Sequence, residues 1–447
     1  MSDSGRQPMT QPFNRQHALD GIAAAGIAGA GGAGFPSHVK LNCRAEIVVA
    51  NGVECEPLLH KDKELMAWDP ETIVRGVDIA RAITGATAGV IALKRKAHAA
   101  IDALKPHLIP GVTLKILGDM YPAGDEVTLC YEATGRIPPP GGLPLDVGIV
   151  VHNVETLWWI GNALPVTDKF LTVGGDVARP LTLRGPIGMA IREALAAAGF
   201  QGNESTHGLL GGGAMMGQLI EDFDAPITKT LGGLIVLPRS HRLLERYLRP
   251  REHGRRIARS ACDQCNFCTQ LCPRYLLGHP VEPHKAMRHI AMSPPGTPPP
   301  ESARYCCGCQ LCSFWSCPED LDPGWITFDD RQELQTLGKT PKLPQTTVHP
   351  MYEFRKPPIN ALKRKLGLDQ FTDSAPLKPL RIETDRVRIP LRQHVGAPAE
   401  AVVGVGTRVA KGQPIARIPE GKMGVMLHAS IDGVITGVGD AIEIRRH

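Results

Sequence analysis

The distribution of cysteines constrains the fold more than any other feature of this sequence. Nine of the twelve cysteines lie between Cys262 and Cys317. They form two runs: Cys262-x-x-Cys265-x-x-Cys268-x-x-x-Cys272-Pro273 and Cys306-x-x-Cys309-x-x-Cys312-x4-Cys317-Pro318. A dense local group in a long chain indicates metal binding, because disulfide frameworks are typical of short secreted chains.

The two runs have the spacing of two-cluster ferredoxins, in which three cysteines ligate one [4Fe–4S] cluster and the fourth, before a proline, ligates the other. This rule gives two ligand sets: Cys262, Cys265, Cys268 and Cys317 for one cluster, and Cys306, Cys309, Cys312 and Cys272 for the other. The second run has one extra residue before its last cysteine, and Cys307 could replace Cys306. Zinc is the alternative. A zinc ion takes four ligands, so a zinc site would not need the third C-x-x step or the trailing Cys-Pro of each run. We therefore expect an electron-transfer protein.

Composition excludes several classes of function. The length of 447 residues is enough for about three domains at roughly 150 residues each. A formal net charge of +5 and 5% aromatic residues give no support to a nucleic-acid partner. No stretch of about 18 uninterrupted apolar residues is present, so we expect no transmembrane segment and a cytoplasmic protein.

The first part of the chain has the pattern of an open α/β sheet. Three apolar runs, Glu46–Ala50, Val112–Leu117 and Val147–Val151, alternate with helical stretches at Pro70–Ile83 and His98–Leu104. Ligands of such sheets bind at the carboxyl ends of the strands. A polar cluster lies at each of these exits: Asn51–Pro57, Tyr121–Glu126 and Val151–Thr156. Each cluster alone could be a solvated loop, but together they predict a ligand site.

A glycine-rich loop, Gly29 to Gly34, precedes Lys40 and matches G-x-G-x-x-G. No strand precedes it and no helix clearly follows it, so the context of a dinucleotide fingerprint is missing. Its bare amides still suit a phosphate or a flat aromatic ring. A helix-packing turn is the alternative.

These segments resemble the flavin mononucleotide and NADH site of the flavoprotein subunit of respiratory complex I. They are residues 29–40, residues 51–62 and the string Asn153-Val154-Glu155-Thr156. The resemblance implies FMN and NADH, held by ten residues with Glu54 as the catalytic candidate: Gly31, Gly32, Gly34, Lys40, Asn51, Glu54, Gly124, Asp125, Glu126 and Asn153. Two positions depart from that flavoprotein, since Val53 replaces an acid and His152 replaces a common asparagine.

The rest of the chain extends the resemblance to two-cluster relatives, the C subunit of the Rnf complex and the cobalamin reductase of the propanediol-utilisation microcompartment. Residues 1–164 would form a Rossmann-like flavin domain, 165–240 a β-grasp soluble-ligand-binding domain and 241–335 an α-helical ferredoxin domain. Residues 336–380 are rich in Pro and Lys and are expected to be a linker. Residues 381–447 look like a barrel-sandwich hybrid. Its C-terminal position favours the cobalamin reductase, because the comparable Rnf module is N-terminal.

The resemblance implies a multidomain α/β oxidoreductase that passes electrons from NADH through FMN and two [4Fe–4S] clusters to a corrinoid. The alternative is an Rnf-like relay that exchanges electrons between NAD and a ferredoxin-type or other protein partner. The basic segment Arg239–Arg259 motivates it, as an exposed connecting helix near an acidic partner. A place in the lumen or at the shell of a bacterial microcompartment, with shell or enzyme proteins as partners, is also implied.

Overall fold

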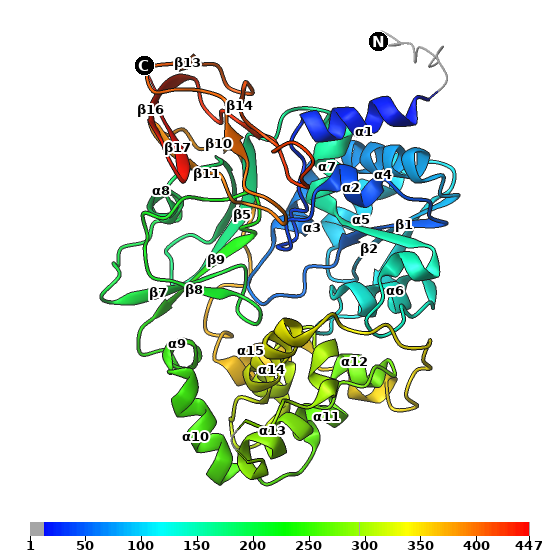
Figure 1. Cartoon of the computed structure of the whole chain (residues 1–447). Helices are drawn as coiled ribbons and strands as arrows, with labels where there is room; N and C mark the ends of the chain where they lie inside the picture. The colour runs from blue at the N-terminus through cyan, green and yellow to red at the C-terminus, as the bar shows by residue number, and fades with distance from the viewer. Residues whose placement is uncertain (1–12, 295, 447) are drawn as a thin grey trace.

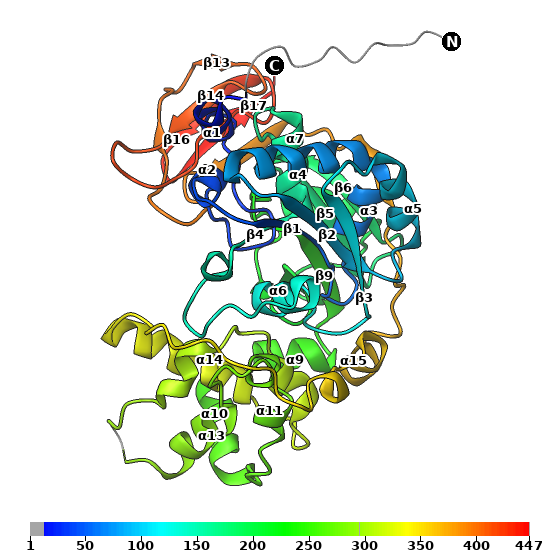
Figure 2. The same ribbon diagram turned by 90° about the vertical axis from the view of Figure 1, so that its right-hand side faces the viewer.

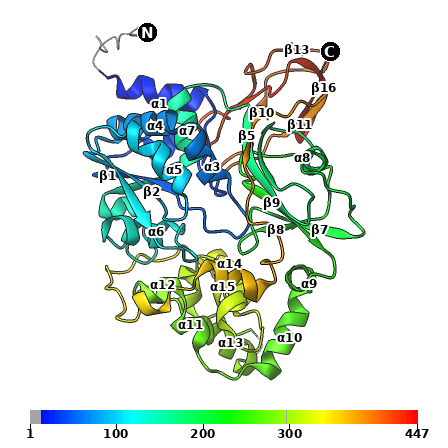
Figure 3. The same cartoon turned by 180° about the vertical axis from the view of Figure 1, so that it is seen from behind.

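The computed structural model describes residues 13–294 and 296–446 (Figure 1). The cysteine-rich helical module lies at one end of the molecule, and the sheets lie at the other (Figures 1 and 3). None of the described helices is long and apolar enough to cross a membrane.

The first sheet has four parallel strands in the order β3-β2-β1-β4. The strands are β1 (Ile47–Gly52), β2 (Ala88–Lys94), β3 (Val112–Leu117) and β4 (Ile149–Asn153). The three apolar runs of the sequence are therefore strands, although the last begins two residues later than expected. Alternate residues serve the two faces, since Val48 and Ala50 pack into one core and Val49 into another.

Helices cover both faces of this sheet (Figure 2). They are α3 (Lys61–Trp68), α4 (Pro70–Thr84), α5 (His98–Leu104), α6 (Glu126–Thr134) and α7 (Val154–Asn162). α4 and α7 pack together on one face and α6 covers the other. The predicted helix α4 begins with Asp69 capping the amide of Thr72 and ends at the left-handed Gly85, which are ordinary start and stop signals.

The glycine-rich loop lies between α1 (Arg15–Ala24) and α2 (Ser37–Leu41). The sequence predicted no clear helix after the loop, whereas α2 is a helix of five residues. Its apolar side chains are few, which is why its pattern is weak; Leu41 is fully buried.

The second sheet has six strands in the order β10-β6-β5-β9-β7-β8. The strands are β5 (Asp168–Gly175), β6 (Leu181–Pro186), β7 (His207–Gly211), β8 (Gln218–Ile220), β9 (Gly233–Pro238) and β10 (Leu377–Arg381). Helix α8 (Ile191–Ala197) packs on it through Ile191, Ala194 and Leu195.

The segment 336–380, expected to be a linker, contains ordered elements. β10 pairs in parallel with β6, and helix α15 (Ile359–Leu366) buries Ile359, Leu362 and Leu366. Those three residues follow helical spacing, but the surrounding Pro and Lys residues obscure it in the sequence. The segment therefore connects the cysteine module to the second sheet by packing and not only by chain continuity.

The cysteine-rich module is built from short helices. They are α9 (Arg242–Leu248), α10 (Arg251–Ala261), α11 (Phe267–Gln270), α12 (Pro273–Leu276), α13 (Pro283–Met292), α14 (Pro323–Leu337), η3 (Glu301–Tyr305) and a π-helical turn η4 (Cys312–Ser316). Three further 3₁₀ turns lie elsewhere: η1 (Lys105–His107), η2 (Pro144–Val147) and η5 (Glu353–Arg355).

The C-terminal part consists of two small antiparallel sheets, β11-β17-β16-β13 and β12-β14-β15. The strands are β11 (Arg386–Pro390), β12 (Glu400–Ala401), β13 (Arg408–Val409), β14 (Pro414–Arg417), β15 (Leu427–His428), β16 (Gly433–Val438) and β17 (Ala441–Arg445). These sheets lie beside α1 and the glycine-rich loop in both Figures 1 and 2, although the two parts are far apart in sequence.

Candidate active site

The strand order creates a site between β1 and β4. The chain proceeds from β1 outward to β2 and β3, and then returns to place β4 on the other side of β1. Such a reversal opens a crevice at the carboxyl ends of the two strands, where open α/β sheets bind ligands. The last residues of these strands include Asn51 and Asn153, both predicted site residues.

The two asparagines hold the crevice together. Asn51 Nδ2 donates to the carbonyl of Gly124 at 3.0 Å, which connects it to the predicted polar cluster Tyr121–Glu126. Asn153 caps α7 by accepting from the amide of Glu155 at 2.9 Å, and its Nδ2 donates to Asp62 Oδ2 at 2.8 Å. The structure therefore brings the polar exits of β1 and β4 and the segment after β3 into one place.

The glycine-rich loop lies against this crevice. A Cβ on Gly31 would lie 3.3 Å from the Cβ of Asn153, tighter than most real contacts, while nothing lies within 4 Å of the corresponding position at Gly32. The φ of Gly32 is +106°, a conformation that side chains rarely adopt. The loop therefore presents bare backbone, as a flat ring or a phosphate requires.

The other end of the loop is braced by the C-terminal sheets. The amide of Val395 donates to the carbonyl of Gly34 at 3.0 Å. A Cβ on Gly34 would lie 2.9 Å from Thr230 Cγ2 and 3.1 Å from the Cα of His394. The conformation of the loop thus depends on residues nearly 200 and 360 positions away along the chain.

The predicted charged residues have different surroundings. Lys40 Nζ lies 2.8 Å from Glu126 Oε1, and their side chains are 32% and 41% exposed, so a ligand can reach them. Asp125 is occupied, because it caps α6 and accepts two bonds from Arg274, at 3.0 Å from Nε and 2.7 Å from Nη2. Asp125 therefore couples this domain to the cysteine module.

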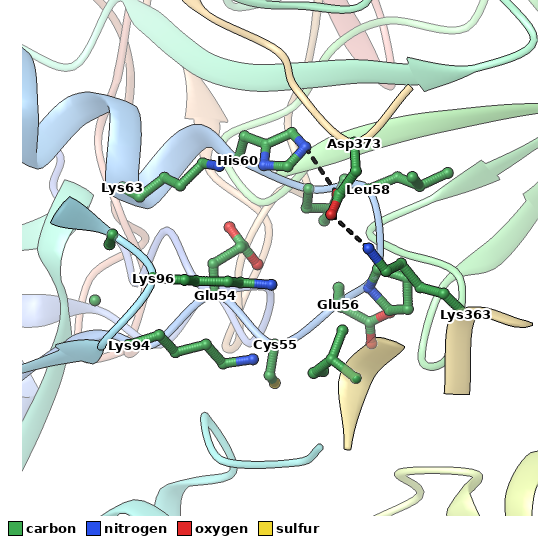
Figure 4. A pocket seen from close by; sticks show the side chains of 15 residues that line it. Glu54, Cys55, Glu56, Leu58, His60, Lys63, Lys94, Lys96, Lys363 and Asp373 are labelled. Atoms are coloured by element: carbon green, nitrogen blue, oxygen red, sulfur yellow. Dashed lines mark hydrogen bonds and ion pairs between the residues drawn. The ribbon is translucent and has the colours of Figure 1, made fainter. Parts of the chain in front are cut away.

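Glu54 and Glu56 follow β1 and line a cavity of about 430 Å³ that is partly open to solvent (Figure 4). Burial and then repulsion by Asp62 raise the pKa of Glu54 to about 8, and its Oε2 is buried without a hydrogen-bond partner. Burial also raises the pKa of Glu56 to about 7, although it accepts from the amides of Met215 and Met216. The glycine–methionine loop 211–217 is thus anchored on Glu56.

A buried charge network beneath the crevice was not singled out from the sequence. Glu155, which is fully buried, lies 2.6 Å from Lys169 Nζ and 3.0 Å from Lys61 Nζ. Lys61 also pairs with Asp62, and Lys169 donates to the carbonyl of Ala30 in the glycine-rich loop at 3.2 Å. A lysine within the apolar strand β5 was the available signal, because such a residue needs a buried partner.

The first predicted set of cysteines lines one hollow at the far end of the molecule. Cys262, Cys265, Cys268 and Cys317 face this hollow, and Cys265 is exposed. Burial raises the pKa of Cys268 to about 12, with further contributions from the three other cysteines of the set. The left-handed conformations of Gln264 and Asn266 wrap the loop around the hollow.

The second set is deeper and closer to the candidate flavin residues. Cys272, Cys306, Cys309 and Cys312 are all buried. Tyr121, which precedes Gly124 in the first domain, donates its hydroxyl to the carbonyl of Cys309 at 2.8 Å. Cys307 also lies near this set, and a hydrogen bond from Cys309 lowers the pKa of Cys307.

The arrangement of thiols suits iron–sulfur clusters, in which each cysteine binds a different iron, better than a single metal ion. Within residues 13–294 and 296–446, no three His, Cys, Asp or Glu side chains converge on a position for a single metal ion. The first set of four cysteines nevertheless lines one hollow, the second set is buried, and all twelve cysteines are free thiols. The donor set, all thiolates, is the one that [4Fe–4S] clusters use.

Some arginines of the basic segment Arg239–Arg259 contact the cysteine module. Arg246 lies 2.7 Å from Asp322 and 4.7 Å from the ring centre of Phe314, and Arg251 stacks over Trp325 at 4.3 Å. The outer face of α10 keeps further arginines in solvent, namely Arg256 and Arg259. The expected exposed helix thus keeps most of its arginines in solvent, while Arg246 packs on the cysteine module.

Three family models match this chain. They are the Nuo51 FMN-binding domain over residues 22–162, a 4Fe-4S dicluster domain over residues 261–322 and the RnfC barrel sandwich hybrid domain over residues 368–446. The matches confirm the predicted classes of the first, third and last domains, and with them FMN and iron–sulfur clusters.

Two curated relatives match over nearly the whole length, and a third matches over part of it. The chain is 45% identical to the cobalamin reductase PduS of Salmonella typhimurium over 94% of both chains, and 43% identical to that of Citrobacter freundii over 95% of both chains. It is 32% identical to the C subunit of the Na(+)-translocating ferredoxin:NAD(+) oxidoreductase complex of Acetobacterium woodii, over 60% of this chain and 62% of that one.

Proposed function

The chain belongs to the family of the cobalamin reductases PduS, and from this membership we propose that it is an oxidoreductase that delivers electrons from NADH to a corrinoid by way of FMN and two [4Fe–4S] clusters. The observation that carries the proposal is the direct contact between the FMN-binding domain and the cysteine module, through Tyr121 and Cys309 and through Asp125 and Arg274.

The residues of the crevice fit a flavin. We assign Gly31, Gly32 and Gly34 to the bare surface against which the ring or phosphate lies, and Lys40 to the anionic part. FMN, when bound, accepts a hydride and releases single electrons. Asn51 and Asn153 orient the walls of the crevice, and Glu54 presents a carboxyl group beside it.

Other predicted residues have supporting roles in this proposal. Glu126 holds Lys40 in position, Gly124 accepts the bond from Asn51, and Asp125 fixes the domain contact. A Cβ on Gly124 would lie 2.6 Å from the carbonyl of Val53, which supports the need for glycine at that position.

The positions of the cysteines support an order for the two clusters. The set Cys272, Cys306, Cys309 and Cys312 is buried beside the flavin domain, so we assign it to the cluster that receives electrons first. The set Cys262, Cys265, Cys268 and Cys317 lies at the open hollow, so we assign it to the cluster that delivers them. Cys307 lies near the set Cys272, Cys306, Cys309 and Cys312 and is not one of its proposed ligands.

The finer architecture and the location are also proposals. The parallel order β3-β2-β1-β4 supports a Rossmann-like flavin domain at 1–164, and the six-stranded sheet supports a β-grasp domain at 165–240. The cysteine module would span 241–335 and the barrel-sandwich hybrid 381–447, with 336–380 as a packed connection. Action in the lumen or at the shell of a bacterial microcompartment follows from the family resemblance.

A relay to a protein partner is the second candidate, favoured by one observation. The exposed Arg256 and Arg259 lie on α10, which leads directly into Cys262. An acidic protein could dock there and exchange electrons with the exposed cluster.

An anaerobic experiment distinguishes the two candidates. The reconstituted protein is mixed with NADH, its flavin and cluster absorption is followed, and cob(III)alamin is then added. Bleaching by NADH followed by reduction of the corrinoid is the expected result. If dithionite bleaches the chromophores but NADH does not, electrons enter from a protein partner and the relay replaces our proposal.

A further inference from the structure

The cavity beside Glu54 contains more positive charge than its own carboxylates neutralise. Four lysines line it and come from four parts of the chain: Lys63 of α3, Lys94 at the end of β2, Lys96 in the turn after it and Lys363 of α15 (Figure 4). Glu54 of this cavity belongs to the proposed flavin site, but none of the four lysines has a role in that assignment.

Two carboxylates pair with three of these lysines. Asp119 lies 2.9 Å from Lys94 Nζ and 3.1 Å from Lys96 Nζ, and Asp373 pairs with Lys363. Asp373 also lies 3.3 Å from Nε2 of His60, but burial lowers the pKa of His60, which keeps that ring neutral.

Lys63 has no ion pair within the residues that the structure describes. Its neighbour Glu64 accepts from the amide of Leu377 at 3.2 Å instead. The remaining acids of the cavity, Glu54 and Glu56, have pKa values raised to about 8 and about 7, so near pH 7 they offset the lysine charge only in part. Four ammonium groups thus face two carboxylates that are fully ionised.

Such an excess is unfavourable in a half-buried space unless an anion enters it. Lys63 and Lys94 are not fully solvated, and desolvation lowers the pKa of Lys63. An ordinary solvated lysine face would have its ammonium groups in water, as Lys105 does on the surface. The convergence of these four lysines on one partly open cavity suits a phosphate or diphosphate group, which lysines bind as point charges.

We propose that this lysine pocket, formed by Lys63, Lys94, Lys96 and Lys363, binds the phosphate part of a ligand that carries a phosphodiester or a diphosphate. The inference rests on the proposed function only for the identity of the ligand. The diphosphate of the dinucleotide donor and the phosphodiester of a corrinoid nucleotide loop share this chemistry.

The test uses the reconstituted holoprotein and inorganic pyrophosphate as the probe, followed by titration calorimetry. The double variant Lys63→Gln/Lys96→Gln removes two charges, and Asp119 keeps Lys94 as its partner. Lys105→Gln, on the surface of the same domain, is the matched control. We expect the double variant to bind pyrophosphate at least tenfold more weakly than the wild type, with the control unchanged.

Equal pyrophosphate affinity in the wild type and the double variant, or no binding to either, would overturn the proposal. If the double variant fails to fold, Lys63→Gln alone serves, because it breaks no ion pair, and a weaker affinity is again expected. Unchanged flavin and cluster absorption verifies folding.

Competition kinetics then identify the ligand. Pyrophosphate that raises the KM for NADH assigns the pocket to the donor, and pyrophosphate that raises the KM for cob(III)alamin assigns it to the acceptor. Binding without competition against either would overturn a role in substrate binding. Because calorimetry needs no electron transfer, the proposed function can fail while the pocket still binds the probe.

Discussion

Replacing Glu54 by Gln should make the protein more stable, and increasingly so as the pH rises. The carboxyl of Glu54 is buried, and burial moves its pKa from an ordinary value of 4.5 to about 8. Below about pH 4.5 the folded and unfolded chains both keep the proton. Between pH 4.5 and 8 the unfolded chain loses it and the folded chain does not, so the free energy of unfolding falls by about 1.4 kcal/mol per pH unit. The total loss is roughly 4 to 5 kcal/mol.

A glutamine keeps the shape of the protonated carboxyl and does not titrate. Between pH 5.5 and pH 8 the stability advantage of Glu54→Gln over the wild type should grow by roughly 3 kcal/mol. For a domain of this size that corresponds to an increase of about 6 to 12 °C in the difference between melting temperatures.

Differential scanning calorimetry of both proteins at the two pH values measures this difference. Glu46→Gln, which removes an exposed carboxylate at the start of the same strand, is the control and should show a pH-independent difference. If the gap between Glu54→Gln and the wild type is the same at pH 5.5 and pH 8, Glu54 is already ionised at the lower pH and the prediction is refuted.

Three further results are expected. Arg274→Met leaves a buried carboxylate without its cation, so the free energy of unfolding should fall by roughly 3 kcal/mol, with Arg274→Lys restoring part of it in the same melting experiment. Gly34→Ala forces a left-handed backbone and a contact of 2.9 Å, which should cost roughly 2 to 4 kcal/mol and lower the FMN content of the purified protein; the control Gly21→Ala has free space and should retain its flavin. Cys265→Ser and Cys309→Ser should each remove a different cluster, and two identical electron paramagnetic resonance spectra would contradict the assignment.

Much of the site could be predicted because its signals are local. The apolar runs ending in Asn51 and Asn153 identify the strand exits, since polar residues there have no packing role. The cysteine spacing likewise reports on a loop that wraps one ligand, so the sets led by Cys262 and Cys306 required no knowledge of the rest of the fold.

The remaining features depend on contacts between distant segments. Lys169 and Glu155 form a pair only because β5 passes beneath α7, and the sequence near either residue does not identify its partner. The strand β10 is similar: Leu377–Arg381 lies in a Pro- and Lys-rich segment and becomes a strand because the edge of β6 accepts it. The family resemblance assigned Asp125 to the ligand site, but its partner Arg274 lies far along the sequence and could not be predicted.

The bond between Val395 and Gly34 has a consequence for the biosynthesis of the protein. Val395 follows Gly34 by 361 positions, so the loop that we assign to the flavin leaves the ribosome long before its brace exists. At about 5 to 20 residues per second, this interval lasts roughly 20 to 70 s. Flavin insertion therefore belongs at the end of synthesis, and a chain truncated before the last two sheets would contain the entire FMN-binding sequence yet lack the support that gives its loop a binding shape.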